Sequence, residues 1–244
     1  MKVNAIIQAR CGSTRLPGKI FMEIDGKPLL WHVVNRLTYV DSIDDIIVAT
    51  TTDDKDNMTE EWCRKNEIKC YRGSEDDVLN RFYSAAVAFP CDVIVRVTAD
   101  DPFKEPDIID LIIKKLVDEN LDLACNVFPP SYPEGLDCEV FRFDVLETME
   151  KTTNDPYDRE HVTPYIYGNP DKFKIGNVTS PRQLSQYRWT IDNQEDYEMV
   201  KTIYEKRKNG NEEILLMDEI FEILEENPEI ASINSNVKRS AMYQ

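Results

Sequence analysis

Long apolar runs are missing from this sequence. Nowhere do eighteen apolar residues follow one another, which is about the length that a membrane-spanning helix needs. The apolar stretch at residues 1–8 is short, soon reaches charged residues and lacks the small-residue cleavage site of a secretory signal. We therefore expect a cytoplasmic protein with no membrane partner.

Histidine and closely paired cysteines are also scarce. The chain has two histidines and six scattered cysteines, none in a Cys-x-x-Cys arrangement, so a structural zinc site is not expected. Reduced thiols, several of them buried, are the simpler interpretation. Cys11 lies in the loop discussed below, but no histidine stands near it in the sequence to activate it. We expect a small, tolerated side chain there and not a nucleophile.

Basic residues are outnumbered, 29 against 46 acidic ones, and the net charge of −17 argues against a nucleic-acid partner. The basic residues are concentrated at the start of the chain. Residues 1–36 carry a net charge of +4, which leaves −21 for the remainder. A basic island in an acidic chain indicates a compact anionic ligand held locally, and a polyphosphate suits that better than a long polymer.

The spacing of the apolar residues alternates along the chain between that typical of strands and that typical of helices. Their spacing predicts strands at residues 3–8, 45–51, 68–71, 92–98, 121–127, 138–143, 173–178 and 187–191. It predicts helices at residues 28–37, 53–66, 76–89, 106–118, 160–167, 194–207 and 218–226.

Strands that alternate with helices of this length favour a Rossmann-like three-layer α/β fold, with a mostly parallel central sheet covered on both faces. Neither repeats nor a linker are visible, so we expect a single domain over residues 1–244. The turn-rich connection at about 128–173 could form a subdomain for the acceptor or for dimerisation. Ligands of such sheets bind beyond the carboxyl ends of the strands.

The strongest motif directly follows the first predicted strand, and it reads QARCGSTRLPGK over residues 8–19. Its glycines permit exposed backbone N–H groups, its hydroxyls add donors, and three fixed positive charges could hold a triphosphate. Those charges belong to Arg10, Arg15 and Lys19. The motif is no Walker loop, because the glycines are too widely spaced and Lys19 precedes an isoleucine. The alternative is a solvated basic loop with ordinary turn glycines.

Carboxylates follow two other predicted strands. Asp100 and Asp101 are adjacent at the end of the strand at 92–98, and Mg²⁺ prefers one or two carboxylates together with phosphate oxygens. Taken alone, Asp100 could also be a turn residue, and Asp192 looks like a helix N-cap. Arg96 lies in an apolar strand and needs a partner, either phosphate or Asp100.

Two further groups of polar residues are candidates for binding. Residues 72–74 follow a third strand, where a base-recognition loop would lie, although a β-turn before a helix explains them equally well. Our candidates for an acceptor pocket are Gly135, Asp137, Glu139, Arg159, Glu160 and His161. His161 could be catalytic or structural with equal weight, whereas His32 is expected to face a helix surface or to pack structurally, and Trp189 to lie in the core.

With these motifs the chain resembles the cytidylyltransferases that make CMP-activated sugar acids. The resemblance rests on residues 8–19 and on GKPL at 26–29, YRGSEDDVL at 71–79, RVTADDP at 96–102, REHVTPY at 159–165 and RWTID at 188–192. The nearest group looks like the spore-coat polysaccharide biosynthesis protein F family. The enzymes that activate 3-deoxy-manno-octulosonate and acylneuraminate look more distant. None of the motifs is specific for an acceptor.

The resemblance implies a fold of the nucleotide-diphospho-sugar transferase type with a mixed sheet, and a homodimer. It implies transfer of CMP from CTP to a sugar acid or related acceptor for surface polysaccharide, with release of pyrophosphate. Mg²⁺ would be held by Asp100 and Asp192, and Arg15 and Lys19 would complete the catalytic set. The expected nucleotide contacts are Gln8, Ala9, Arg10, Gly12, Ser13, Arg15, Lys19, Arg72, Gly73, Ser74 and Thr98.

Two other functions compete with this one. A glycosyltransferase of similar shape typically carries Asp-x-Asp after the nucleotide-binding strand, whereas here Asp100 and Asp101 have no spacer. A nucleotide-sensing module without catalysis is expected to lack one metal carboxylate, yet both candidates are present. The acceptor stays open between a keto-sugar acid, a sugar phosphate and a phosphorylated amino acid. The preference for CTP follows from the resemblance alone.

Overall fold

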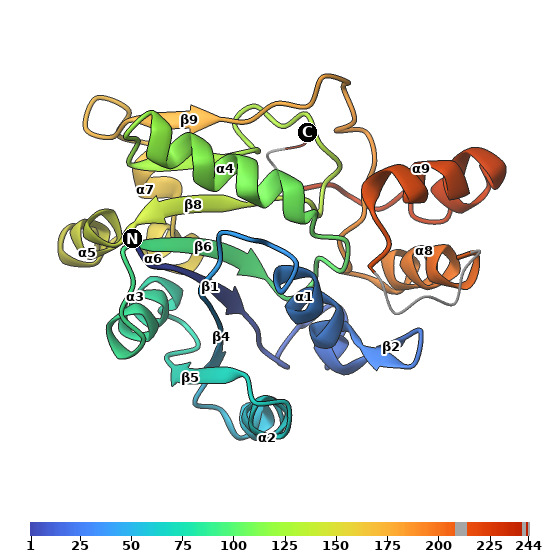
Figure 1. Cartoon of the computed structure of the whole chain (residues 1–244). Coiled ribbons are helices and arrows are strands. Elements are labelled where there is room, and N and C mark those ends of the chain that lie inside the picture. Colours follow the sequence, from blue (N-terminus) through green and yellow to red (C-terminus); the bar gives the residue numbers. More distant parts are fainter. Residues whose placement is uncertain (208–213, 241–242, 244) are drawn as a thin grey trace.

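A twisted sheet forms the centre of the computed structural model, which describes residues 1–207, 214–240 and 243 (Figure 1). Within these residues the sheet has seven strands in the order β5-β4-β1-β6-β8-β7-β9. Its strands are β1 (Val3–Gln8), β4 (Asp45–Thr51), β5 (Lys69–Gly73), β6 (Val93–Thr98), β7 (Leu123–Cys125), β8 (Glu139–Arg142) and β9 (Ile175–Asn177). A small hairpin, β2 (Glu23–Ile24) and β3 (Lys27–Pro28), lies outside this sheet.

The strands β5, β4, β1 and β6 are parallel, β8 runs antiparallel to both β6 and β7, and β9 is parallel to β7. The expected mostly parallel, mixed sheet is therefore confirmed. From β1 the chain first adds β4 and β5 on one side, and then places β6 on the other. A crevice opens at such a reversal, beyond the carboxyl ends of β1 and β6.

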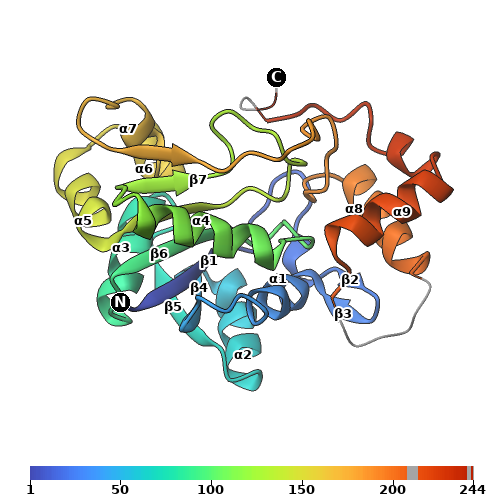
Figure 2. The same ribbon diagram turned by 45° about the horizontal axis from the view of Figure 1, so that its top comes forward.

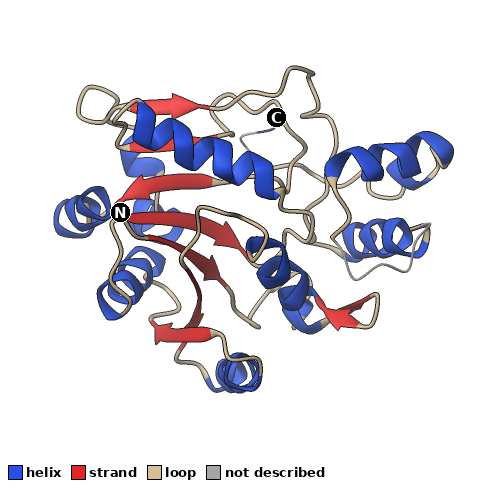
Figure 3. Cartoon of the chain, viewed as in Figure 1, coloured by secondary structure: helices blue, strands red, loops and turns tan. Residues whose placement is uncertain are grey.

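Helices cover both faces of the sheet (Figures 2 and 3). They are α1 (Leu29–Leu37), α2 (Asn57–Lys65), α3 (Val78–Ala88), α4 (Pro106–Asp118), α5 (Phe143–Thr152), α6 (Pro156–His161), α7 (Pro164–Tyr167), α8 (Gln194–Glu205) and α9 (Met217–Glu226). One apolar core lies beneath α1, α4, α8 and α9, and a second beneath α3 and α5. This is the expected three-layer arrangement.

Local sequence signals mark the starts of several helices. The apolar face predicted for α1 is fully buried, and Pro28 precedes its first turn. Asp77 caps α3 by accepting a hydrogen bond from the Asn80 amide at 3.0 Å. The predicted helix at 53–66 begins as a separate 3₁₀ turn, η2 (Asp54–Asp56), which Asp53 caps.

Four features differ from the sequence-based expectation. The helix predicted at 160–167 is broken between α6 and α7, because Val162 adopts a φ of 73° and Pro164 starts a new helix. Residues 187–191 form no strand among the described residues, only a single parallel bridge between Glu134 and Arg188. Helix α5 was not predicted. The strands β7, β8 and β9 are shorter than their apolar runs.

The segment at 128–173 contributes β8 to the centre of the main sheet, between β6 and β7, and adds α5, α6 and α7 beside it. The single domain and the acceptor or dimer subdomain both stay predictions. No helix in the described part of the chain has the length and apolar character required to cross a bilayer.

Candidate active site

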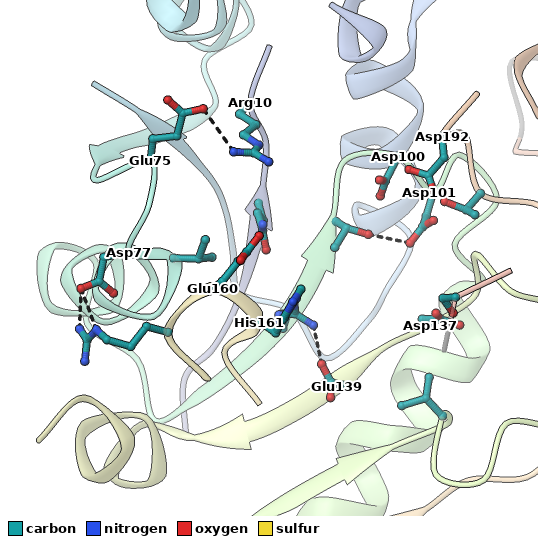
Figure 4. Close-up of a pocket in the computed structure, with 18 of the residues that line it drawn as sticks. Arg10, Glu75, Asp77, Asp100, Asp101, Asp137, Glu139, Glu160, His161 and Asp192 are labelled. Atoms are coloured by element: carbon teal, nitrogen blue, oxygen red, sulfur yellow. Dashed lines mark hydrogen bonds and ion pairs between the residues drawn. The ribbon is translucent and has the colours of Figure 1, made fainter. Parts of the chain in front are cut away.

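A cavity of about 870 Å³ opens at the carboxyl ends of β1 and β6. Many of the predicted site residues line it: Gln8, Arg10, Arg15, Thr98, Asp100, Asp137, Glu139, Arg159, Glu160, His161 and Asp192. Figure 4 shows Asp100 and Asp192 together at one end of the cavity, away from Arg10 and Glu75. Segments from both halves of the chain therefore converge on one polar hollow.

Lys19 connects the basic loop to the two candidate metal carboxylates. Its Nζ lies 2.8 Å from Asp100 Oδ2 and 3.0 Å from Asp192 Oδ1, and it also donates to the Ile191 carbonyl at 2.7 Å. The Lys19 side chain is only 10% exposed. Burial opposes its positive charge, but the two carboxylates outweigh that effect and raise the pKa of Lys19. Burial likewise opposes ionisation of Asp100, yet Lys19 lowers the pKa of Asp100 to about 2.

Arg15, at the rim of the cavity, contacts the carboxylate of Asp192. Its guanidinium lies 2.8 Å from Asp192 Oδ1, and its side chain is 58% exposed. Asp192 thus contacts two of the three cations of the loop that were predicted to grip a polyphosphate, whereas the third, Arg10, pairs with Glu75 at 3.2 Å.

The adjacent Asp101 has different partners. Its Oδ2 accepts from Lys104 Nζ and from the Thr98 hydroxyl, both at 2.8 Å. Burial raises the pKa of Asp101, and Lys104 opposes that rise. Of the two neighbouring aspartates, only Asp100 shares a cation with Asp192.

Several residues of the basic loop shape it and do not line the cavity. The Ser13 hydroxyl accepts from the Leu16 amide at 3.3 Å, within the loop itself. At Gly12 a Cβ would lie 3.1 Å from Glu75 Oε1, and Gly18 has a left-handed φ of 70° that favours glycine. Ala9, which donates to the Ala49 carbonyl at 3.2 Å, belongs to the same scaffold.

Cys11 is packed beneath this loop. Its amide donates to Asp56 Oδ1 at 2.8 Å, and its thiol lies 3.6 Å from the Thr59 hydroxyl. Burial raises the pKa of the Cys11 thiol to about 11, so the thiol is protonated at neutral pH. This agrees with a packing role.

The structure does not bring Arg72, Gly73 or Ser74 to the cavity wall. The Arg72 guanidinium points to the α2 side, where it donates to the carbonyls of Thr51 and Asp53 and to Asn57 and Glu60, at 2.7–2.9 Å. Residues 75–78 line the cavity in their place. Base recognition near this loop stays a prediction, but the Arg72 side chain already has protein partners.

Arg81, which the sequence analysis missed, anchors that loop from below. It is completely buried, and it donates to the carbonyls of Ser74 and Glu75. A Cβ at Gly73 would lie 3.0 Å from Arg81 Cγ, so glycine permits the close approach. Burial, assisted by the nearby Arg10, lowers the pKa of Arg81 to about 10. An arginine inside the apolar face of a helix was the available signal.

The expected acceptor residues are spread along the cavity, with Asp137 on the side of Asp101 and with Glu160 and His161 between Asp101 and Asp77 in the view of Figure 4. Glu139 accepts from Arg96 at 2.6 Å and from the Tyr167 hydroxyl at 2.7 Å. In the structure Arg96 pairs with Glu139, its cross-strand neighbour in β8, and not with Asp100, while the phosphate alternative stays a prediction.

The remaining acceptor candidates differ in how firmly they are held. Arg159 pairs with Asp77 and Glu150 at 2.7–2.8 Å. Asp137 accepts from the Tyr243 hydroxyl, and burial raises the pKa of Asp137 to about 7. His161 is exposed in the cavity, and its ring centroid lies 4.5 Å from that of Tyr157.

Two residues expected to have packing roles do have them. His32 is buried, and its Nε2 lies 2.7 Å from the Ile24 carbonyl. Trp189 is buried in the core against Phe103 and Phe221. Neither lines the cavity.

The pair Asp100 and Asp192 fits a hard divalent cation. The described residues contain no ready-made group of three or more His, Cys, Asp or Glu side chains that could hold a metal ion. Mg²⁺ does not need one, since it is commonly bound by one or two carboxylates with substrate phosphates and waters. The two carboxylates already converge on one cation, the Lys19 ammonium, so oxygens of both can face a single ion.

Comparison with known proteins gives matches along nearly the whole chain. The profile of the cytidylyltransferase family matches residues 4–235. An uncharacterized protein of Methanocaldococcus jannaschii is 40% identical over 243 residues, which are 99% of this chain and 98% of that protein. The spore coat polysaccharide biosynthesis protein SpsF of Bacillus subtilis is 34% identical over 235 residues, 93% of this chain and 95% of that protein.

A solved structure extends the likeness to three dimensions. The structure of a cytidylyltransferase from Leptospira borgpetersenii serovar Hardjo-bovis is 33% identical, with a TM-score of 0.89 over 98% of this chain and 99% of that one. The 3-deoxy-manno-octulosonate cytidylyltransferase of Geobacter metallireducens is a more distant relative. It is 36% identical over 119 residues, which are 48% of this chain and 45% of that enzyme.

Proposed function

Because the chain belongs to the cytidylyltransferase family, we propose that it transfers CMP from CTP to a sugar acid or related acceptor and releases pyrophosphate, in a magnesium-dependent reaction. Its likeness to the B. subtilis spore coat polysaccharide protein supports a role in surface polysaccharide or glycan biosynthesis. The glycosyltransferase and the non-catalytic module have no observation in their favour.

One observation carries the proposal. The ammonium group of Lys19, in the basic loop, lies within 3.0 Å of two carboxylates, those of Asp100 after β6 and Asp192 before α8. Both carboxylates line a large polar cavity. A loop that grips phosphates and a pair of carboxylates that holds a cation are the parts that nucleotidyl transfer needs in one place.

The reaction proposed here is an in-line displacement at the α-phosphorus of CTP. An acceptor oxygen forms a bond to that phosphorus, the bond to the bridging oxygen breaks, and pyrophosphate leaves with the electron pair. Arg15 and Lys19 would bind the phosphate oxygens, and their fixed charges would stabilise the leaving group. Arg10 faces the same cavity and would contribute a third charge.

Asp100 and Asp192 would hold Mg²⁺. Bound there, the ion would neutralise charge on the phosphate oxygens and orient the reacting groups. Within this chain, Lys19 contacts both carboxylates, and Arg15 contacts Asp192 in addition. The polyphosphate and its cation would replace these contacts between the basic side chains and the carboxylates. The backbone would then need to move little.

The acceptor would occupy the part of the cavity that Asp137, Glu139, Arg159, Glu160 and His161 line. Among these, Glu160 and His161 are exposed and would be able to contact a ligand without breaking buried contacts. Cytosine would lie toward residues 75–78, near the loop that Arg81 anchors.

Pyrophosphate release tests the proposal directly. The protein is incubated with Mg²⁺, one of the four ribonucleoside triphosphates and one acceptor, with 3-deoxy-manno-octulosonate, N-acetylneuraminate and a hexose phosphate as probes. We expect acceptor-dependent pyrophosphate with CTP, and a loss of that signal in EDTA. Binding of CTP without turnover for every acceptor would favour a sensor, and activity with another nucleotide would overturn the CTP assignment.

The proposal also includes a cytoplasmic enzyme that acts as a homodimer. Light scattering coupled to size-exclusion chromatography measures the number of chains per particle. A mass of one chain at micromolar concentration would contradict the dimer and leave the proposed reaction unaffected.

A further inference from the structure

Arg188 occupies the centre of a buried ionic network beside the candidate metal site. Its side chain is 5% exposed. Its NH1 donates to Glu134 Oε1 at 2.7 Å, its NH2 to Asp192 Oδ2 at 3.0 Å, and its Nε to Asp196 Oδ1 at 2.9 Å. A single guanidinium thus joins three carboxylates from two segments of the chain, Glu134 in one and Asp192 and Asp196 at the start of α8 in the other.

The two oxygens of Asp192 have different partners. Oδ2 accepts from Arg188, whereas Oδ1 faces Lys19 and Arg15. Arg188 therefore holds one oxygen of the Asp192 carboxylate and leaves the other directed toward the other cations. Asp196 supports this arrangement, because its Oδ2 also accepts from the Asp192 amide at 3.0 Å.

The same network extends to the acceptor side of the cavity. Glu134 lines the cavity, and besides Arg188 it accepts from Arg239 at 3.0 Å. The turn that carries Glu134 approaches Arg188 closely because Gly135 has a φ of 109°. A Cβ at Gly135 would lie 2.7 Å from the Thr190 amide nitrogen. Gly135, expected to contact an acceptor, has this packing role and is absent from the cavity lining among the described residues.

We propose that Arg188 is a positioning residue, which orients Asp192 for the divalent cation and couples that carboxylate to Glu134 in the cavity wall. The inference rests on the proposed function, since it takes Asp192 as a ligand of the cation. Groups that hold a metal ligand in place from behind typically change metal affinity or activity by about 10–100-fold when they are removed.

Arg188→Lys tests this inference. Lysine keeps the charge, but a single ammonium cannot reproduce the planar fork. Mn²⁺ serves as the spectroscopic probe for the cation, and its dissociation constant is measured by electron paramagnetic resonance in the presence of CTP. We expect the variant to bind Mn²⁺ about tenfold more weakly. We also expect a lower kcat, with CTP affinity in EDTA unchanged.

Arg142→Lys is the matched control. Arg142 also makes structural hydrogen bonds, to the Leu121 carbonyl and to Asn120 at 2.8 Å, but it lies outside the cavity lining. A role in stability alone would lower the melting temperature of both variants and leave Mn²⁺ affinity at the wild-type value in both. That outcome would overturn the inference.

Glu134→Gln keeps the test open if Arg188→Lys does not fold. This variant retains the side-chain shape but weakens the hold on Arg188, and we expect a smaller loss of Mn²⁺ affinity, about threefold. Unchanged affinity in this variant would count against the coupling. Failure of the wild-type protein to bind Mn²⁺ with CTP would overturn the proposed function itself, which is a different result from equal binding by wild type and variants.

Discussion

Lys19 and Asp192 are 173 positions apart in the sequence, yet the ammonium of one lies 3.0 Å from the carboxylate of the other. This contact joins the loop after the first strand to the start of α8. Because Asp100 contacts the same ammonium, one lysine organises the charges of the candidate site. It holds together two carboxylates that would otherwise repel each other.

Replacing Lys19 is expected to weaken nucleotide binding. In Lys19→Ala the positive charge that contacts Asp100 and Asp192 is lost, and we expect the dissociation constant of CTP with Mg²⁺ to rise at least about tenfold, or about 1.4 kcal/mol. Isothermal titration calorimetry measures this constant. Lys27→Ala is the control, since Lys27 is an exposed lysine that lies over the Trp31 ring. Equal losses in the two variants would exclude a specific role for Lys19.

Removing the charge of Asp192 is expected to abolish turnover and leave the fold intact. Asparagine keeps the size of the side chain but is a poorer ligand for a hard cation, so we expect kcat to fall by about a hundredfold or more. Circular dichroism and the melting temperature report on the fold. Glu195→Gln, an exposed carboxylate in the first turn of α8, is the control. A wild-type rate in Asp192→Asn would show that this residue is not a cation ligand.

Asp137 is expected to make stability depend on pH. Its pKa is raised to about 7 in the folded protein, mainly by burial, whereas an unfolded aspartate titrates near about 4. Between these values the folded state binds the extra proton. The contribution of Asp137 to the free energy of unfolding is therefore complete below about pH 4, and it declines by about 1.4 kcal/mol per pH unit until about pH 7.

Urea denaturation of wild type and Asp137→Asn at several pH values measures this contribution as a difference. Other groups titrate alike in both proteins, so they cancel. We expect the asparagine variant to gain stability relative to wild type as the pH rises from 5 to about 7. Parallel pH profiles would mean that the pKa of Asp137 is not raised in the folded protein.

Cys11 is expected to be dispensable for the reaction. Its thiol is buried and has a pKa raised to about 11, so it is not a thiolate at neutral pH. We expect Cys11→Ala to release pyrophosphate within about twofold of the wild-type rate. Loss of turnover in a folded Cys11→Ala protein would require a direct role for the thiol.

The sequence predicted most of the parallel half of the fold. Residues 3–8 and 45–51 are strands with the predicted bounds, and 106–118 is a helix with the predicted bounds. Apolar periodicity is clear there because both faces of the sheet are buried. The resemblance to cytidylyltransferases, with the spore-coat group nearest, is confirmed by the family match and by the relatives.

The contacts of the site could not be predicted in the same way. Residues 187–191 have a strand-like apolar pattern, but they instead meet Glu134 and Asp100 through isolated backbone bonds, such as Ile191 N to Asp100 O at 2.9 Å. Such bonds depend on tertiary packing, which periodicity does not report. The roles of Arg81 and Arg188 were missed for a related reason. A charged residue in a sequence looks solvated until its buried partners are known.

The backbone hydrogen bond from Ile191 to Asp100 also has a consequence for folding during synthesis. Residues 1–118 hold the four parallel strands and the whole phosphate loop, but only half of the carboxylate pair. During synthesis an ordered sheet could therefore precede any ability to hold the cation. The ability to bind the cation would arise only when the last third of the polypeptide docks. Completion of the fold and the onset of activity would therefore coincide.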